Sequence, residues 1–166
     1  MKIYKLHKKQ KLPITLEKAW EFLSNPKNLS NLTPPEMNFT IVSGADRPMF
    51  AGQIIQYIVT PVLGIKTNWV TEITQVKDDH FFIDEQRVGP YALWHHQHFF
   101  EEHPDGVQMT DIVHYIIPFG VIGRFANWLF IRKQLEGIFN YRTTQVNKIF
   151  QRNTAKTIHL NALDNY

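Results

Sequence analysis

The sequence predicts one α+β domain in which a curved antiparallel sheet of seven strands wraps around a long C-terminal helix. Three observations lead to this fold class. The 166 residues suit a single domain. Short strand-like segments follow one another between residues 38 and 117 with only turn residues between them, which is typical of an antiparallel meander. A helical pattern of apolar residues then begins near Val121. We expect the domain to cover residues 1–150, with residues 151–166 forming a frayed C-terminal tail because periodicity is lost there.

The N-terminal part supplies one strand and two short helices. Charged and apolar residues over about residues 2–12 predict the first strand, whose lysines suit an exposed edge. Thr15 is placed to cap a helix whose apolar residues recur at helical spacing up to Leu23. Pro26 suits the first turn of a second short helix. The segment 33–35 contains two prolines and is expected to be a loop.

Six further strands and a long helix complete the predicted order. The strands are expected at residues 38–43, 52–60, 65–76, 80–88, 91–101 and 107–117. The helix carries apolar residues at three- and four-residue spacing as far as Phe150, and Gly137 inside it predicts a bend or a close-packing point. The basic pairs Arg132-Lys133 and Tyr141-Arg142 are expected on its solvated side.

In the last three predicted strands, polar and aromatic residues occupy the same set of alternate positions. Side chains alternate between the two faces of a strand, so one face collects both kinds. A turn at Pro104–Gly106 is expected to close the final hairpin. The predicted register sets His96 opposite Asp111, His98 opposite Met109 and Trp94 opposite Val113. Polar groups on the buried side of a sheet indicate an internal pocket, and the expected ligand-binding residues are Trp69, Asp84, Gln86, Trp94, His96, His98, Asp111 and Tyr115.

The large aromatic residues have two possible roles. Most are expected to be core, which is usual for large apolar side chains: Trp69, Phe82, Trp94, Phe100, Tyr115, Phe125, Trp128 and Phe139. Trp69, Trp94 and Tyr115 are preferred as cavity lining because an N–H or O–H group can also contact a ligand. The segment 119–131 is either a mobile lip of the cavity or an ordinary helix start.

Three interpretations of the polar residues stay open. His96 with Asp111 or Asp84 can form a catalytic acid–base pair, since a carboxylate orients an imidazole and raises its pKa. The same groups can orient a ligand, or they can simply satisfy one another in a buried network. His96 and His98, two residues apart on one strand face, can share a metal ion, although we expect neither a metal nor another cofactor.

Composition excludes several other classes. There is no cysteine, so disulfides and thiolate metal sites are impossible, and a cytoplasmic location is expected. A net charge of +3 with few aromatic residues among the basic ones argues against nucleic-acid binding. The longest apolar run, 119–131, is too short and too interrupted for a transmembrane segment, and no secretory signal is expected. Oligomeric state is not predicted.

The element order, together with the motifs in residues 82–100 and 109–120, resembles the START-like superfamily, also called SRPBCC or helix-grip. The matching run reads Phe82-x-Asp84-x-Gln86-x-x-Gly89-Pro90-Tyr91-x-x-Trp94-x-His96-x-His98-x-Phe100, then Met109-x-Asp111-x-Val113-x-Tyr115-x-x-Pro118-Phe119-Gly120. The chain looks most like the ligand-binding branch near the polyketide cyclase/dehydrase group. The resemblance implies a cavity between sheet and C-terminal helix for a lipid, a sterol or a polyketide-like molecule. The function expected is therefore binding of a mostly apolar small molecule, and the alternative is a cyclase, dehydratase or hydrolase.

Overall fold

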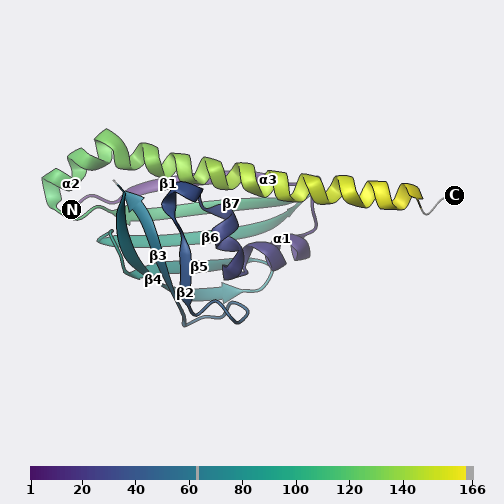
Figure 1. Cartoon of the computed structure of the whole chain (residues 1–166), viewed down its shortest axis with the longest axis horizontal. Helices are drawn as coiled ribbons and strands as arrows, with labels where there is room; N and C mark the ends of the chain where they lie inside the picture. Colours follow the sequence, from purple (N-terminus) through teal and green to yellow (C-terminus); the bar gives the residue numbers. More distant parts are fainter. Residues whose placement is uncertain (63, 164–166) are drawn as a thin grey trace.

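The computed structural model describes the backbone of residues 1–62 and 64–163 and the side chains of residues 1–61 and 64–150. The described chain forms one curved sheet, and a single long helix lies along it (Figure 1). The sheet has seven antiparallel strands in the order β1-β7-β6-β5-β4-β3-β2. Their bounds are β1 Tyr4–Leu12, β2 Thr40–Ser43, β3 Gln53–Val62, β4 Ile65–Lys77, β5 Phe81–Val88, β6 Leu93–His103 and β7 Gly106–Ile116.

Short helices follow β1, as predicted. In α1 (Leu16–Leu23), the Thr15 hydroxyl accepts a hydrogen bond from the Lys18 amide, so the predicted N-cap is confirmed. The second predicted helix is a 3₁₀ helix, Pro26–Leu32, with its proline in the first turn. A further 3₁₀ turn, Pro35–Met37, overlaps the segment 33–35 that was expected to be a loop, because proline presets the backbone angle that such a turn needs.

The C-terminal helical region has three parts, α2 (Gly120–Ala126), a π-helical turn (Asn127–Ile131) and α3 (Arg132–Leu163). The prediction for Gly137 was wrong in one respect, because an added Cβ there would meet no atom within 4 Å. The helical region instead bends near α2 and the π-helical turn (Figure 1), where π-type turns commonly disturb a helix. The predicted tail begins at residue 151, where side chains lie outside the described residues, so that division of the chain stays a prediction.

The long helix is held against the sheet by apolar packing and by hydrogen bonds near its start and near its middle. The side chain of Gln10 on β1 donates to the Thr143 carbonyl at 2.9 Å and to the Asn147 side chain at 2.8 Å. Near the start of α3, the Gln134 side chain donates to the Pro61 carbonyl. One apolar stripe of α3 faces the sheet and consists of Leu135, Phe139, Val146 and Phe150.

The turn that joins β6 to β7 depends on Gly106, whose φ is +130°. A Cβ on this residue would clash with the Leu12 carbonyl oxygen of β1. We therefore expect Gly106→Ala to lower the free energy of unfolding by about 1–3 kcal/mol, the usual cost of overpacking. Gly137→Ala is the matched control, because its Cβ has open space and alanine favours a helix by roughly 0.5–1 kcal/mol. Urea denaturation of both variants tests this, and equal effects would contradict it.

Candidate functional site: a His/Asp/Arg cluster on a cavity wall

Three adjacent strands bring two carboxylates and two imidazoles together. Residues Trp94, His96, His98 and Phe100 of β6 are all buried, while the residues between them are less so, as period-two alternation requires. Asp84 of β5 is the direct partner of His96, and Asp111 of β7 is the direct partner of His98. The four polar residues therefore share the concave face of the sheet, which confirms the predicted alternation.

The predicted register of the final hairpin was wrong by two residues. In the structure, Trp94 lies opposite Tyr115, His96 opposite Val113 and His98 opposite Asp111. The reason is the turn, which uses Pro104 and Asp105 as its two central residues, with His103 paired to Gly106. A shift of two residues keeps every side chain on its predicted face, whereas a shift of one would have turned the cluster outward.

Each imidazole lies between the two carboxylates. His98 Nε2 is 2.9 Å from Asp84 Oδ2 and its Nδ1 is 2.7 Å from Asp111 Oδ1. His96 Nε2 is 3.2 Å from Asp111 Oδ1 and its Nδ1 is 3.5 Å from Asp84 Oδ2. His98 therefore makes the two shortest contacts with the carboxylates. His96 makes the longer contacts, as a neutral ring with one N–H does.

The pKa values of Asp84, Asp111 and His96 are shifted by burial and by the charges around them. Burial disfavours ionisation of Asp84, but the charges of His96 and His98 and a hydrogen bond from His98 outweigh it and lower its pKa. Burial also opposes ionisation of Asp111, yet Arg142 and the two histidines hold its pKa well below the usual range. Burial, and then the neighbouring His98, lower the pKa of His96, and the two carboxylates offset this only in part.

The cluster is electrically balanced when the two imidazoles hold one extra proton between them. Their ring centroids are 3.7 Å apart, so two positive charges there would repel by about 4 kcal/mol at an effective dielectric of about 20. One imidazolium and the Arg142 guanidinium then match the two carboxylates. Such balance allows charged groups to stay buried without a large net electrostatic penalty.

Arg142 was expected on the solvated side of the helix, and that prediction was wrong. It is 9% exposed and lies on the inner face of α3, between Phe139 and Val146. Its Nη2 is 3.5 Å from His98 Nδ1 and its Nη1 is 3.9 Å from Asp111 Oδ1, while its buried Nε has no hydrogen-bond partner among the described residues. Helical spacing was the available signal, since residue 142 falls on the same stripe as residues 135, 139 and 146.

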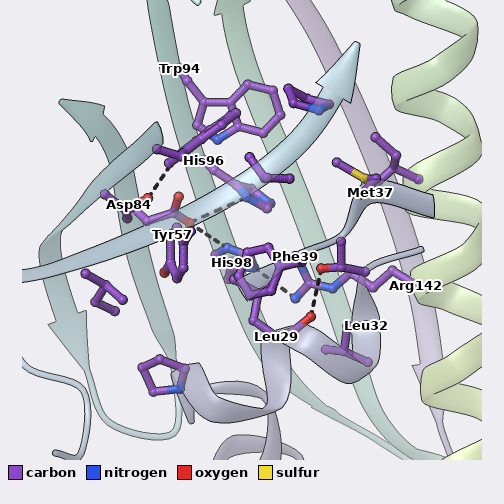
Figure 2. A pocket seen from close by; sticks show the side chains of 18 of the residues that line it. Leu29, Leu32, Met37, Phe39, Tyr57, Asp84, Trp94, His96, His98 and Arg142 are labelled. Atoms are coloured by element: carbon purple, nitrogen blue, oxygen red, sulfur yellow. Dashed lines mark hydrogen bonds and ion pairs between the residues drawn. The ribbon is translucent and has the colours of Figure 1, made fainter. Parts of the chain in front are cut away.

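A cavity of about 190 Å³ opens beside this cluster, bounded by the sheet, the short helices and α3. Figure 2 shows Asp84, His96, His98 and Arg142 on its wall, with Tyr57, Phe39 and Leu29 among the side chains around it. The rest of the wall is mostly apolar and is contributed by Leu23, Leu32, Met37, Met49, Ile55, Val59, Ile73, Phe82, Leu135, Ile138 and Phe139. A mostly apolar cavity with one group of convergent polar side chains is the usual form of a small-molecule site.

The expected ligand-binding residues divide into two groups. Trp69, Asp84, Trp94, His96 and His98 line the cavity, whereas Gln86, Asp111 and Tyr115 do not. The indole N–H of Trp69 already donates to Thr71 Oγ1 at 3.0 Å.

The three residues that stay off the cavity wall have other partners. Gln86 holds the chain reversal before β6, donating to the Tyr91 carbonyl at 2.7 Å and accepting from the Tyr91 amide. The Tyr115 hydroxyl donates to Asn127 at 3.1 Å. Asp111 lies behind the histidines, where it binds both of them and approaches Arg142.

Two aromatic residues expected in the core lie on the surface instead. Phe125 is 60% exposed and Trp128 is 77% exposed. Helical periodicity alone cannot tell which stripe of a helix faces the protein, and here the stripe of α2 and the π-helical turn that contains Gly123, Asn127 and Ile131 is the buried one.

Asp84, His96 and His98 are also close enough to share a metal ion, since one ligand atom from each lies within 4.8 Å of the others. The same atoms already make the hydrogen bonds of the balanced cluster, and the guanidinium of Arg142 supplies a positive charge beside them. These side chains therefore need no metal to hold them together, and we assign none to the site.

The order of elements defines a helix-grip α+β fold, as predicted. A protein of Mycobacterium smegmatis has a similar structure, with 18% identity, a TM-score of 0.66 and coverage of 90% of this chain and 92% of that chain. An uncharacterised protein of Rhizobium leguminosarum has 12% identity and a TM-score of 0.64, over 89% and 96% of the two chains. The di-domain ARO/CYC protein StfQ from the steffimycin biosynthetic pathway has 9% identity and a TM-score of 0.69, over 92% of this chain and 52% of its own.

These likenesses establish the fold. No family model matches the sequence, and no curated protein matches it either. No helix in the described part of the chain is long and apolar enough to span a membrane.

Proposed function

We propose that the protein binds a small, mostly apolar molecule in the cavity between the sheet and α3, with the His/Asp/Arg cluster orienting the polar end of that molecule. The observation that carries the proposal is the guanidinium of Arg142. It is buried on the cavity wall, its Nε has no partner among the described residues, and its contacts with Asp111 and His98 are 3.9 and 3.5 Å long. Buried donors without acceptors are rare, and a ligand oxygen would satisfy this group.

The size of the cavity limits the ligand class. A cavity of about 150 Å³ is known to accept a benzene-sized molecule, so about 190 Å³ suits a compact molecule with one or two rings better than a whole sterol. The aromatic wall formed by Trp69, Tyr91 and Trp94 suits such rings. The helix-grip fold of StfQ, an ARO/CYC protein of a biosynthetic pathway, is a further reason to favour a polyketide-like ring system over a linear lipid.

The polar group of the ligand is expected to be an acid. Arginine recognises carboxylates through two parallel hydrogen bonds, and such charge-assisted bonds are about twice as strong as neutral ones. His96, whose pKa is lowered by burial and by the neighbouring His98, can also accept a proton when an anion arrives, because the charge of the anion would offset the repulsion between the two rings.

Binding of two matched probes tests the proposal. Isothermal titration with naphthalene-1-carboxylic acid and with naphthalene-1-methanol should show that wild-type protein prefers the acid by about tenfold, or about 1.4 kcal/mol. Arg142→Met should lose this preference and still bind the alcohol. Arg132→Met is the matched control, since Arg132 is exposed on the same helix, and it should behave as wild type.

Native mass spectrometry of freshly purified protein provides a second readout. An adduct that is present in wild type and absent from the cavity-filling variant Val59→Trp would support the proposal. If neither probe binds and no adduct is found, the cavity is not a binding site. If both probes bind wild type equally, binding stands but recognition of an acid by Arg142 does not.

The alternative is an enzyme of the cyclase, dehydratase or hydrolase type in which His96 acts as the acid–base group. The observation in its favour is that His96 lines the cavity and is held by Asp84 and Asp111. The observation against it is that both nitrogens of each imidazole face carboxylates, which leaves no nitrogen directed at a substrate.

The two functions differ in what His96→Ala does to the co-purified molecule. Mass spectrometry of molecules extracted from wild type and from His96→Ala, both expressed in the same host, separates them. Binding predicts the same mass at altered occupancy, whereas catalysis predicts an unprocessed molecule of different mass in the variant.

A further inference from the structure

A second feature, separate from the cavity, lies on α2 and the π-helical turn. Six large apolar side chains in this segment are between 57% and 81% exposed. They are Phe119, Val121, Ile122, Phe125, Trp128 and Leu129, and we call them the α2 face. Single exposed apolar residues are common on soluble proteins, but a group of this kind in one short segment indicates a surface that meets a partner.

The packing of the opposite stripe fixes the orientation of the α2 face. Gly123 lies so close to the Pro118 carbonyl that no side chain would fit, and Asn127 accepts a hydrogen bond from the Tyr115 hydroxyl at 3.1 Å. Ile131 is buried on the same stripe. The helix cannot rotate to hide its apolar residues without breaking these contacts, so their exposure is built into the fold.

The charged residues within the α2 face and directly after it are basic, and one of them, Arg132, forms an ion pair with Glu136 at 3.2 Å. Arg124 is exposed within it, and Arg132 and Lys133 are exposed directly after it. No acidic residue occurs between Asp111 and Glu136 in the sequence.

The N-terminal strand adds lysines to the same end of the molecule. Lys5 pairs with His114 of β7, shortly before α2 begins, and Figure 1 shows the N-terminus beside α2. Lys2 and Lys5 are both exposed there. A partner of this end of the protein must therefore be apolar in part and negatively charged in part.

We propose that the α2 face docks on the surface of a bilayer containing anionic lipids. Trp, Phe, Ile and Leu on the outer side of a helix, with Arg and Lys beside them, are the composition of helices that lie in the plane of a membrane interface. The segment stands at one end of the molecule, where the helix turns away from the line of α3 (Figure 1), so a flat surface can reach it.

Docking at this position would also place the cavity close to the bilayer. Leu135 and Ile138, in the first turns of α3, line the cavity, and they follow the α2 face on the same continuous helical region. The membrane proposal nevertheless stands without any ligand, because it rests on exposed residues that take no part in the cavity.

Vesicle flotation with the full chain tests the proposal. Two kinds of vesicle are compared. One contains phosphatidylcholine with about 30% phosphatidylglycerol, which represents an anionic membrane, and the other contains phosphatidylcholine alone. Wild type should bind the anionic vesicles at least about tenfold more tightly than the neutral ones. The triple variant Ile122→Ser, Phe125→Ser, Trp128→Ser should lose binding by at least about tenfold, since it removes most of the apolar contact.

Two further variants separate the apolar from the electrostatic contribution. Arg124→Gln with Lys133→Gln should weaken binding to anionic vesicles by on the order of tenfold and leave binding to neutral vesicles unchanged. The control, Val42→Ser, Phe50→Ser, Ile54→Ser, removes three apolar side chains around β2 and β3 that are 47–50% exposed, and it should bind as wild type. All variants change exposed side chains, so their thermal unfolding midpoints should match wild type.

Three outcomes would overturn the proposal. These are wild type remaining in the unbound fraction, wild type binding both vesicle compositions equally, and the control triple variant losing as much binding as the α2 variant. Sedimentation equilibrium tests whether a second copy of this chain covers the surface instead. If wild type does not bind vesicles and forms a dimer that dissociates in the α2 triple variant, the α2 face joins two copies of this chain.

Discussion

Replacing Asp111 with alanine is expected to lower the free energy of unfolding by about 3–5 kcal/mol, because it leaves buried positive charge without its partner. Asp111 is the carboxylate that contacts both imidazoles and approaches Arg142. Without it, the guanidinium and the proton on the imidazoles share Asp84 alone. Urea denaturation, monitored by tryptophan fluorescence, measures the loss of stability.

Glu85→Ala is the matched control on the other face of the same sheet. Glu85 also binds a histidine and an arginine, with His95 at 2.8 Å and Arg87 at 3.1 Å, but these groups are partly exposed. Exposed ion pairs contribute about 0–1 kcal/mol, so this variant should change little. Equal losses in the two variants would contradict the description of the cluster as a buried, balanced network.

The double variant Asp111→Ala, Arg142→Met should be more stable than Asp111→Ala alone. Removing the guanidinium together with its carboxylate takes away the unpaired charge, and a double-mutant cycle measures the coupling between the two residues. A double variant less stable than Asp111→Ala would mean that Arg142 contributes packing rather than charge balance.

The second large effect is a loss of stability on acidification, in two steps. The folded pKa of His96 is below its ordinary value of 6.5, so the unfolded chain binds more protons and stability falls as the pH drops from about 6.5 through the folded pKa. The folded pKa values of Asp84 and Asp111 lie below 3.8, so their contribution is present above that pH and is lost as the pH falls through the folded values. Both steps lower the free energy of unfolding as the pH falls.

Each proton that the unfolded chain binds in excess changes the free energy of unfolding by at most about 1.4 kcal/mol per pH unit. Two other groups have shifted pKa values and do not reverse this direction. Tyr57, on the cavity wall, stays neutral because burial and then the charge of Asp84 raise its pKa. His114, on the outer face of β7, has a pKa lowered by burial and then by Lys5 and His95, so it contributes a change of the same sign.

Urea denaturation between pH 4.5 and 7.5, a window chosen from these shifts, measures the first step. His96→Gln removes the titrating ring and should flatten it, while leaving the second step in place. A wild-type protein that becomes more stable as the pH falls from 7 to 5 would show that the cluster takes up protons on folding, against the assignment of a largely neutral His96.

Much of the site was predictable because strand alternation is a local property. The backbone itself alternates side chains between faces, so Asp84, His96, His98 and Asp111 could be assigned to one face without knowledge of their neighbours. Even the error in the hairpin register was harmless to the cluster, since a slip of two residues preserves the face. Cross-strand partners, in contrast, depend on the exact pairing at the turn, and the predicted register did not follow from a turn in which His103 pairs with Gly106.

The helical region shows where local patterns fail. By its spacing, Arg142 belongs to the apolar stripe of α3. An arginine is nevertheless normally assigned to solvent, because burying a charge costs free energy unless the charge is paired and hydrogen-bonded. Those partners come from β5, β6 and β7, and only their assembly makes the buried position favourable. In the same way, Phe125 and Trp128 are core-like by composition, but the contacts of Gly123 and Asn127 turn them outward.

The sequence by itself determined the seven strands, the long helix and the face on which the polar row lies, because periodicity and turn residues act over a few positions along the chain. The tertiary structure alone decided which charges meet, where the cavity remains and which stripe of α2 is exposed. Those properties arise from contacts between residues far apart in the chain, and their energies depend on burial and on the balance of charge that the folded protein creates.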